Sequence, residues 1–163
     1  RLEGIRRQLE SHGVRDGLEV LSAERSAEAD TLSEGLPYEY NVGRALTAEL
    51  IRRRSNATAL IGVNDMTALG ILAELTARGI RVPSDVSVCG FDNIFSSAIT
   101  TPSLTTIDHH LRTRCQAAVD MILSRTAPAA APGPFVNKIE YTPQLIVRSS
   151  TGKAREGALE SRE

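Results

Sequence analysis

Three polar residues stand at the ends of two apolar runs in the middle of the chain. Asn64 and Asp65 follow the run 60–63, and Asp92 follows the run 86–89 after one Gly-Phe pair. An asparagine side chain both donates and accepts hydrogen bonds, whereas a carboxylate only accepts them. Asn64 and Asp92 together would suit a small polyol, because each hydroxyl group donates and accepts and a carboxylate binds hydroxyls strongly. The expected chemistry is therefore binding of a small polar molecule.

A structural role is the alternative for each of these residues. Asn64 or Asp65 could cap the helix that is predicted to begin at Met66. Asp65 is the better cap because it directly precedes that helix, and this would leave Asn64 free to bind. Asp92 could likewise be a turn residue.

The elements that must position these residues form a strand–helix–strand unit. A helical pattern of apolar residues occupies 66–78 and stops at Gly79. A helix between two such strands implies parallel pairing through a right-handed crossover. In open parallel sheets, ligands bind beyond the carboxyl ends of the strands. This rule alone nominates Asn64, Asp65 and Asp92.

The remainder of the chain continues the alternation of helices and strands. Helices are predicted over 2–11, 42–54 and 108–125. Strands are predicted over 18–21, 104–107, 135–141 and 144–147. The connections at 23–36, 93–103 and 127–134 are predicted to be loops, and 151–163 to be a disordered tail. The pattern predicts an α/β fold with a mostly parallel, Rossmann-like sheet flanked by helices.

Composition lends no support to several classes of function. The 163 residues carry a net charge of −1, which gives no electrostatic argument for nucleic-acid or membrane binding by this segment. No apolar stretch approaches the length of a membrane span. Cys89 and Cys115 are too few and too isolated for a disulfide framework or a zinc site.

Motifs for catalysis and for cofactor binding are missing from the sequence as well. It contains no Gly-rich phosphate loop, no Gly-x-Ser-x-Gly elbow and no cysteine–histidine arrangement with a mechanism. His12, His109 and His110 have no metal-ligand spacing with any cysteine or carboxylate. We therefore expect no enzymatic activity, no catalytic residue, no metal and no cofactor.

Several linked motifs resemble one family of proteins. VNDMTALGIL, RGIRVPSDVSVCGFDN and TPSLTTI, in this order and spacing, closely resemble the LacI/GalR family of bacterial transcription regulators. RLEGIRRQLESHG at the start resembles the family's opening helix, and QLIVRSS near the end resembles its closing strand. The resemblance covers residues 1–150, which is nearly the whole sequence.

The resemblance implies a type I periplasmic-binding-protein-like fold with two subdomains, of which this chain resembles the carboxyl part. Residues 1–107 would form the C-terminal effector subdomain, and the helix 108–126 would belong to the N-terminal subdomain. Residues 127–150 would return as strands that complete the core. The helix-turn-helix and most of the N-terminal subdomain would be absent, so this segment alone is expected to bind effector weakly or not at all.

The resemblance also implies roles for individual residues. Arg1 occupies the place of the arginine that begins the family's R-L-x-G motif and grips the effector. Asn64 and Asp92 match the asparagine and aspartate that bind the effector in the family. Tyr38 falls where the family often has an aromatic residue that packs on the effector, and Tyr40 is the competing candidate.

Self-association is implied by two further segments. The helix 66–78 and the loop 94–99 resemble the family's dimer contact region. Four apolar residues of these segments are expected at the interface: Met66, Leu69, Phe95 and Ile99. His109 stands where the family commonly has glutamine.

The function that the resemblance implies is effector sensing in a cytoplasmic bacterial regulator of transcription. Its partners would be a small-molecule effector, most often a sugar, a second or further copy in a dimer or tetramer, and DNA through a separate helix-turn-helix. The alternative is a periplasmic sugar-binding protein of an ABC transporter, which shares the fold and predicts a signal peptide upstream. An enzyme is a third alternative, because fold alone does not decide function.

Overall fold

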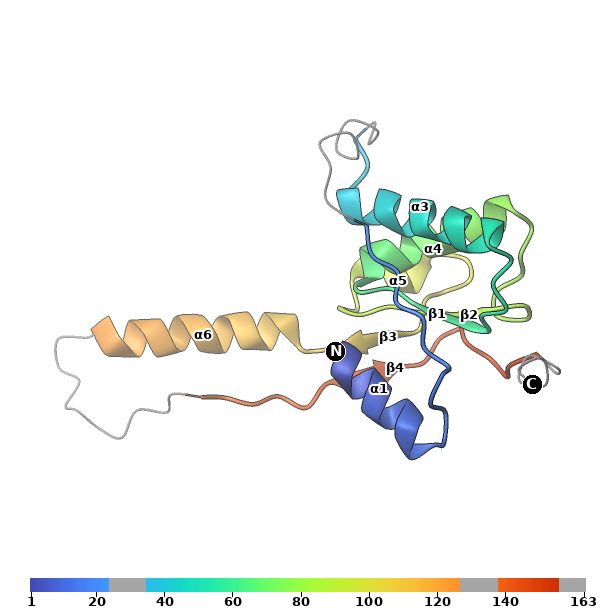
Figure 1. Cartoon of the computed structure of the whole chain (residues 1–163). Coiled ribbons are helices and arrows are strands. Elements are labelled where there is room, and N and C mark those ends of the chain that lie inside the picture. Colours follow the sequence, from blue (N-terminus) through green and yellow to red (C-terminus); the bar gives the residue numbers. More distant parts are fainter. Residues whose placement is uncertain (24–34, 127–137, 156–163) are drawn as a thin grey trace.

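Helices and short strands alternate along the computed structural model, which describes residues 1–23, 35–126 and 138–155 (Figure 1). The helices are α1 (Leu2–Ser11), α3 (Tyr38–Arg52), α4 (Asp65–Ala77), α5 (Phe95–Ile99) and α6 (Leu111–Thr126). The strands are β1 (Ala59–Ile61), β2 (Ser87–Cys89), β3 (Thr106–Asp108) and β4 (Gln144–Ile146). The predicted α/β class is confirmed.

The strands form two hydrogen-bonded pairs. β1 and β2 are parallel, with Leu60 opposite Val88, which confirms the pairing predicted for the central strand–helix–strand unit. β3 and β4 are antiparallel. An isolated parallel bridge between Cys89 and Thr105 connects β2 to the segment that leads into β3. The carboxyl ends of β1 and β2 and the start of β3 therefore meet at one edge.

Two helices, α3 and α4, stack on one side of the strands, and α1 lies on the other side (Figure 1). The apolar core is centred on α4, where Ala68, Leu72 and Leu75 are buried against Val88 and Leu104. Burying each of these leucine and valine side chains stabilises the fold by roughly 1.5–3 kcal/mol. The core therefore fixes the helix whose first turn lies beside the polar residues at the strand ends.

Close approach of α3 to α4 depends on two glycines. A Cβ atom on Gly43 would lie 2.2 Å from the carbonyl oxygen of Thr67, and one on Gly70 would lie 2.0 Å from the carbonyl oxygen of Tyr40. Any other residue at either position would push the two backbones apart. This contact holds α4 between the strands and α3.

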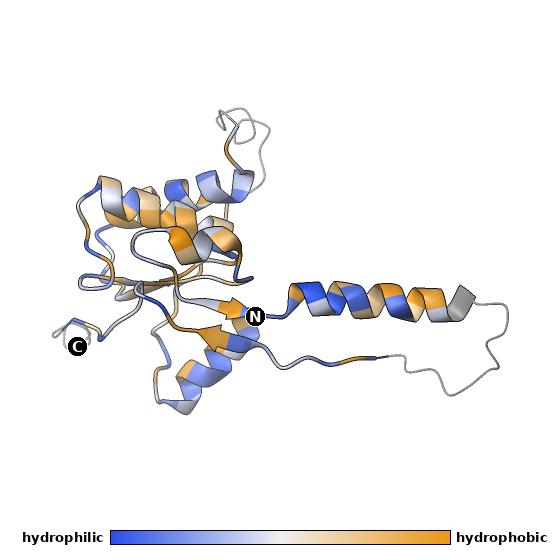
Figure 2. Cartoon of the chain, turned by 180° about the vertical axis from the view of Figure 1, so that it is seen from behind, coloured by the Kyte–Doolittle hydropathy of each residue, from blue (hydrophilic) through white to orange (hydrophobic). Residues whose placement is uncertain are grey.

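α6 projects away from the rest of the described structure (Figures 1 and 2). Four of its apolar residues are more than half exposed: Leu111, Val119, Ile122 and Leu123. The segment after residue 138 runs back toward β4 with Ile139, Leu145 and Val147 also exposed. Within the described ranges, no helix is long and apolar enough to cross a membrane.

Several predicted elements differ from the structure. Residues 18–21 and 138–141 are not paired as strands, and the loop 93–103 contains the short helix α5. An apolar run forms a strand only where another strand offers backbone hydrogen-bond partners. The sequence of the run does not show whether such a partner strand is present. Most of the predicted loops at 23–36 and 127–134, and residues 135–137 of one predicted strand, lie outside the described residues.

The chain beyond Ser150 also differs from the disordered tail that was predicted from residue 151. The Thr151 hydroxyl lies 2.8 Å from the hydroxyl of Thr105, and the backbone N–H of Gly152 donates to Ser87 Oγ at 3.1 Å. The tail is rich in charged residues, but its first residues form polar contacts beside β2. Residues 156–163 lie outside the described residues.

Candidate functional site

The turn after β2 presents Asp92 in an unusual backbone conformation. The φ angles of Asp92 and Asn93 are +118° and +54°, values that residues other than glycine rarely adopt. The backbone N–H of Asp92 donates to the carbonyl oxygen of Ile107 at 2.9 Å, which anchors the turn on β3. Two such residues in succession persist only where the surroundings determine the conformation.

Asp65 holds this turn from the first residue of α4. Its side chain is fully buried, and its Oδ2 accepts a hydrogen bond from the backbone N–H of Ile94 at 2.9 Å. Its Oδ1 accepts from the hydroxyl of Thr106, and its own N–H donates to the carbonyl oxygen of Phe91 at 2.7 Å. Asp65 therefore connects the start of α4 with both ends of the 91–94 turn and with β3.

The residue that caps α4 is Asn64, so the prediction that Asp65 caps the helix and frees Asn64 is wrong. Asn64 Oδ1 accepts from the backbone N–H of Thr67 at 2.8 Å and from its hydroxyl at 2.9 Å. The prediction failed because the turn after β2 takes the Asp65 carboxylate. Capping uses only the oxygen of Asn64, and none of the described residues accepts a hydrogen bond from its amide N–H groups.

Arg148 holds the same turn from the segment after β4. One of its terminal nitrogens donates to the carbonyl oxygen of Leu104 at 2.8 Å and to Ser97 Oγ at 3.1 Å. The other donates to Asn93 Oδ1 at 2.7 Å. The planar fork of an arginine suits a site with several acceptors at fixed positions. Neither Arg148 nor the buried role of Asp65 was predicted, because their partners are distant in the sequence.

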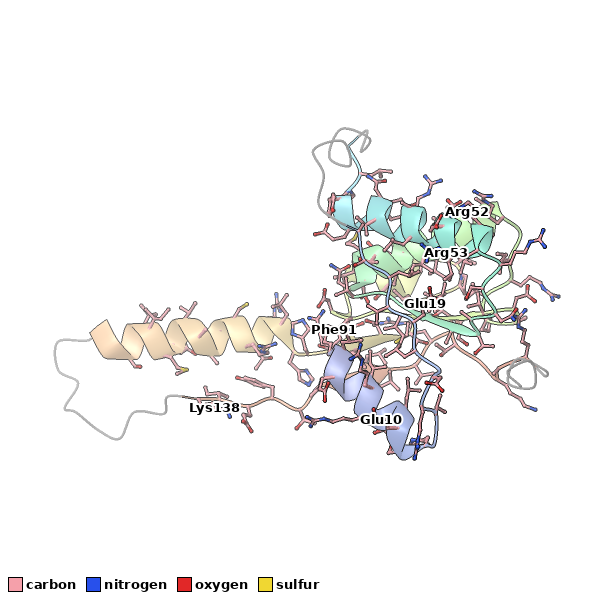
Figure 3. All side chains as sticks on the ribbon, viewed as in Figure 1. Glu10, Glu19, Arg52, Arg53, Phe91 and Lys138 are labelled. Atoms are coloured by element: carbon pink, nitrogen blue, oxygen red, sulfur yellow. The ribbon has the colours of Figure 1, made fainter. Side chains whose placement is uncertain are left out.

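A continuous set of contacts joins Arg1 to Asp92 at this edge. The Arg1 guanidinium lies 3.7 Å from the centre of the Phe91 ring, a cation–π contact, and donates to the carbonyl oxygen of Val63. Phe91 stacks on His109, with ring centres 5.4 Å apart. His109 Nε2 lies 3.1 Å from Asp92 Oδ1. Figure 3 shows Phe91 beside the start of α1.

Three of the four predicted ligand residues are therefore neighbours in the structure. Arg1 reaches the residue before Asn64, and Arg1 and Asp92 are linked through Phe91 and His109. Tyr38 is placed differently, at the first residue of α3, which lies on the far side of α4 from the strands (Figure 1). The aromatic residue in the cluster is Phe91, which sequence reasoning missed although it adjoins Asp92.

Hydrogen bonds beside the cluster favour an ionised carboxylate at Asp108. The backbone N–H of His110 donates to Asp108 at 2.7 Å, and the Asn93 amide donates at 3.1 Å. These hydrogen bonds hold the pKa of Asp108 below its ordinary value, with the contact from His110 contributing most. Among the described residues, no group of three or more histidines, cysteines or carboxylates is arranged to hold a metal ion.

The four residues predicted at a dimer interface lie on α4 and α5. Phe95 and Ile99 are 79% and 65% exposed, whereas Met66 and Leu69 are half-buried. α5 buries one of its two serines, Ser97, completely and turns its two large apolar residues outward. Phe95 and Ile99, four residues apart on α5, therefore lie on the same face of that helix.

A cavity of about 280 Å³ lies away from the Asp92 cluster. It is formed by the ends of α3 and α4 and by the turn before β2, and its lining includes Leu50, Leu75 and Val86. Arg1, Asn64 and Asp92 do not line it. The cluster lies instead on an open edge, so a ligand held there would need a second wall.

Comparisons with known proteins support a single interpretation. Residues 1–151 match the model of the periplasmic binding protein-like domain. The HTH-type transcriptional regulator reg1 of Streptomyces lividans is 35% identical over 152 residues, which cover 92% of this chain and 42% of that protein. The chain thus spans less than half the length of the curated relatives that it matches.

Two solved structures are similar over much of the chain. A LacI-type transcription regulator from Bifidobacterium animalis subsp. lactis has a TM-score of 0.72 and 31% identity, covering 94% of this chain and 50% of its own. A LacI family regulator from Arthrobacter sp. FB24, in complex with lactose, has a TM-score of 0.62 and 29% identity, covering 69% of this chain and 41% of its own.

Proposed function

The chain belongs to the LacI/GalR family, with the periplasmic-binding-protein-like domain as its fold, and we propose that it is the effector-sensing part of a DNA-binding transcription regulator. The observation that carries the proposal is the assembly of Arg1, Asn64 and Asp92 at the carboxyl ends of β1 and β2. That edge is where open α/β sheets bind ligands. The relatives are transcription regulators, which favours this function over an enzyme or a transport protein.

We propose a sugar as the effector. Asp92 offers a carboxylate to hydroxyl groups, and Asn64 and Arg1 offer N–H donors, so the edge can match groups that both donate and accept. The Arthrobacter regulator, a structural neighbour, was solved with lactose. Tyr38 stays a predicted contact, which would have to reach the ligand from α3.

The open edge supports the division of the chain that the family resemblance predicted. We propose that residues 1–107 form one wall of the effector site and that α6, within 108–126, packs on the N-terminal subdomain. Its exposed apolar residues, among them Val119 and Ile122, would be covered there. Residues 127–150 would then return to complete the core.

Regulation requires that the effector distinguish two states of the protein. We propose that effector closure of the two subdomains changes the affinity of a helix-turn-helix outside this chain for DNA. A ligand shifts such an equilibrium only by the difference in its affinity for the two states. We further propose a dimer or tetramer with Met66, Leu69, Phe95 and Ile99 at its interface, in the bacterial cytoplasm.

A thermal-shift panel on the full-length regulator tests the sensing function. The panel contains lactose, maltose, glucose, galactose and ribose, with hypoxanthine and guanine as nucleobase probes. We expect at least one sugar to raise the Tm of the wild type and to leave the Tm of Asp92→Ala unchanged. The same Tm shift in both proteins would contradict the placement of Asp92 in the effector site. A Tm shift with nucleobases alone would contradict the proposal that the effector is a sugar.

A further inference from the structure

His109 lies between a carboxylate and a guanidinium group. Its Nε2 atom is 3.1 Å from Asp92 Oδ1, and its Nδ1 atom is 2.9 Å from a terminal nitrogen of Arg114. Its ring face stacks on Phe91. The side chain of His109 is 15% exposed and that of Asp92 is 28% exposed, so the contact is partly shielded from water.

The two partners of His109 admit only one protonation state. A guanidinium group only donates hydrogen bonds, and an ionised carboxylate only accepts them. Nδ1 must therefore accept from Arg114, which requires it to be bare, and Nε2 must carry the proton that it donates to Asp92. The other neutral tautomer would satisfy neither partner, and an imidazolium would direct an N–H at Arg114.

We propose that His109 is a positioning residue of the effector site, a neutral imidazole protonated on Nε2 that orients the Asp92 carboxylate, with Arg114 selecting this tautomer. The hydrogen bond from His109 occupies Oδ1 of Asp92. Among the described residues, Oδ2 of Asp92 has no hydrogen-bond partner, so the chain leaves this second oxygen for an effector hydroxyl. The proposal rests on the proposed function, because it assumes that Asp92 binds the effector.

Charged groups surround His109 on every element that contacts it. Asp92 approaches from the turn after β2, and Arg114 approaches from the first turn of α6. Arg1 lies over Phe91, the ring on which His109 stacks. Asp108, its neighbour in the chain, accepts a hydrogen bond from the backbone N–H of His110 instead. The orientation of Asp92 is therefore linked through one ring to the start of α6.

Nitrogen-15 NMR of the imidazole rings tests the tautomer directly, and no effector is needed. The chain contains three histidines, and the spectrum of His109→Gln identifies the signals of His109. At mildly alkaline pH we expect His109 to show a protonated Nε2 and a bare Nδ1. A protonated Nδ1, or the averaged signals of a freely exchanging ring, would overturn the proposal.

Substitution of Arg114 tests whether this residue selects the tautomer of His109. Arg114→Leu should shift His109 toward a mixture of tautomers, whereas Arg112→Leu removes the same charge two residues away on the same helix and should leave the signals unchanged. Residues two apart on a helix point in different directions, which makes the pair a matched control. Equal spectra for the two variants would show that Arg114 does not select the tautomer.

The carbon-13 signal of the Asp92 carboxylate reports whether His109 orients that group. His109→Phe keeps a ring next to Phe91 but cannot donate, so we expect the Asp92 signal to move. His109→Gln retains an N–H donor and should restore the signal, which a purely steric role would not predict. These experiments contain no effector. Their failure would therefore reject only the positioning role of His109, whereas a failed sugar panel would reject only the proposed function.

Discussion

The fully buried Asp65 accepts, at its Oδ2, a hydrogen bond from the backbone N–H of Ile94 at 2.9 Å. Asp65, the first residue of α4, thereby fixes the turn in which Asp92 and Asn93 adopt positive φ angles. The geometry of the candidate site thus depends on a residue that is buried beneath it.

Replacing Asp65 by alanine should lower the free energy of unfolding by about 2 kcal/mol, because the buried Thr106 hydroxyl would be left without an acceptor and the Ile94 N–H would lose its partner. Urea denaturation followed by circular dichroism measures the change. The control is Asp120→Ala, an exposed position on α6 where a change within about 0.5 kcal/mol is expected. Equal effects of the two substitutions would contradict the anchoring role of Asp65.

Replacing Arg148 by lysine should loosen the same turn while preserving the charge. An ammonium group cannot reach Asn93, Ser97 and Leu104 with the geometry of a forked guanidinium. We expect faster amide hydrogen exchange over 93–97 than in the wild type, with little change in β1. Arg112→Lys on α6 is the matched control. Unchanged exchange in Arg148→Lys would show that the fork is dispensable.

Acid should destabilise the fold through two surface carboxylates, Glu49 and Asp85, that pair with arginines. Arg52 and Arg53 lower the pKa of Glu49 from 4.5 to about 2, and Arg81 lowers that of Asp85 from 3.8 to about 2. A carboxylate with a depressed pKa in the folded state contributes stability above its ordinary pKa. That contribution is lost as the pH falls from about 4.5 to about 2.

Unfolding measurements at intervals across this pH range check the loss. Glu49→Gln should remove part of the pH dependence, whereas Glu39→Gln, near the other end of α3, should not. Because both carboxylates form their ion pairs at the surface, added salt should weaken the pH dependence of stability. A dependence that is identical in Glu49→Gln and in the wild type would contradict the assignment.

A charge on α5 should disrupt self-association. Phe95 is the most exposed of the four predicted interface residues, so Phe95→Glu would place a carboxylate inside an apolar contact. Light scattering on the full-length regulator should show a dimer or tetramer for the wild type and a smaller species for the variant. Val20→Glu, also at an exposed apolar position, should behave as the wild type. A monomeric wild type would reject the interface.

The strand–helix–strand unit β1–α4–β2 was predictable because the sequence patterns that specify it are local. The parallel pairing of β1 and β2 follows from two short apolar runs around a helical pattern, and both runs deliver polar residues to the same edge. The positions of Asn64 and Asp92 at that edge follow from the same pattern. Family resemblance added Arg1, whose contact with Phe91 no local pattern could predict.

Long-range partners explain what was missed. The position of Asp65 before a helical pattern predicts a helix cap. Its actual partners, the N–H of Ile94 and the hydroxyl of Thr106, are distant in the sequence and contact its carboxylate only in the folded chain. The role of Arg148 is hidden for the same reason. The antiparallel pairing of β3 with β4 also depends on a chain reversal that apolar patterns do not specify.

Calorimetric titration of the full-length regulator is the most direct test of effector binding at this edge. Lactose, maltose, glucose, galactose and ribose are titrated into the wild type, Asp92→Ala and Asp92→Asn, the last of which keeps an acceptor at the strained position. The proposal predicts that a sugar bound by the wild type loses about 2 kcal/mol or more with Asp92→Ala, roughly a thirtyfold weaker Kd, and less with Asp92→Asn. An affinity unchanged by Asp92→Ala would contradict it.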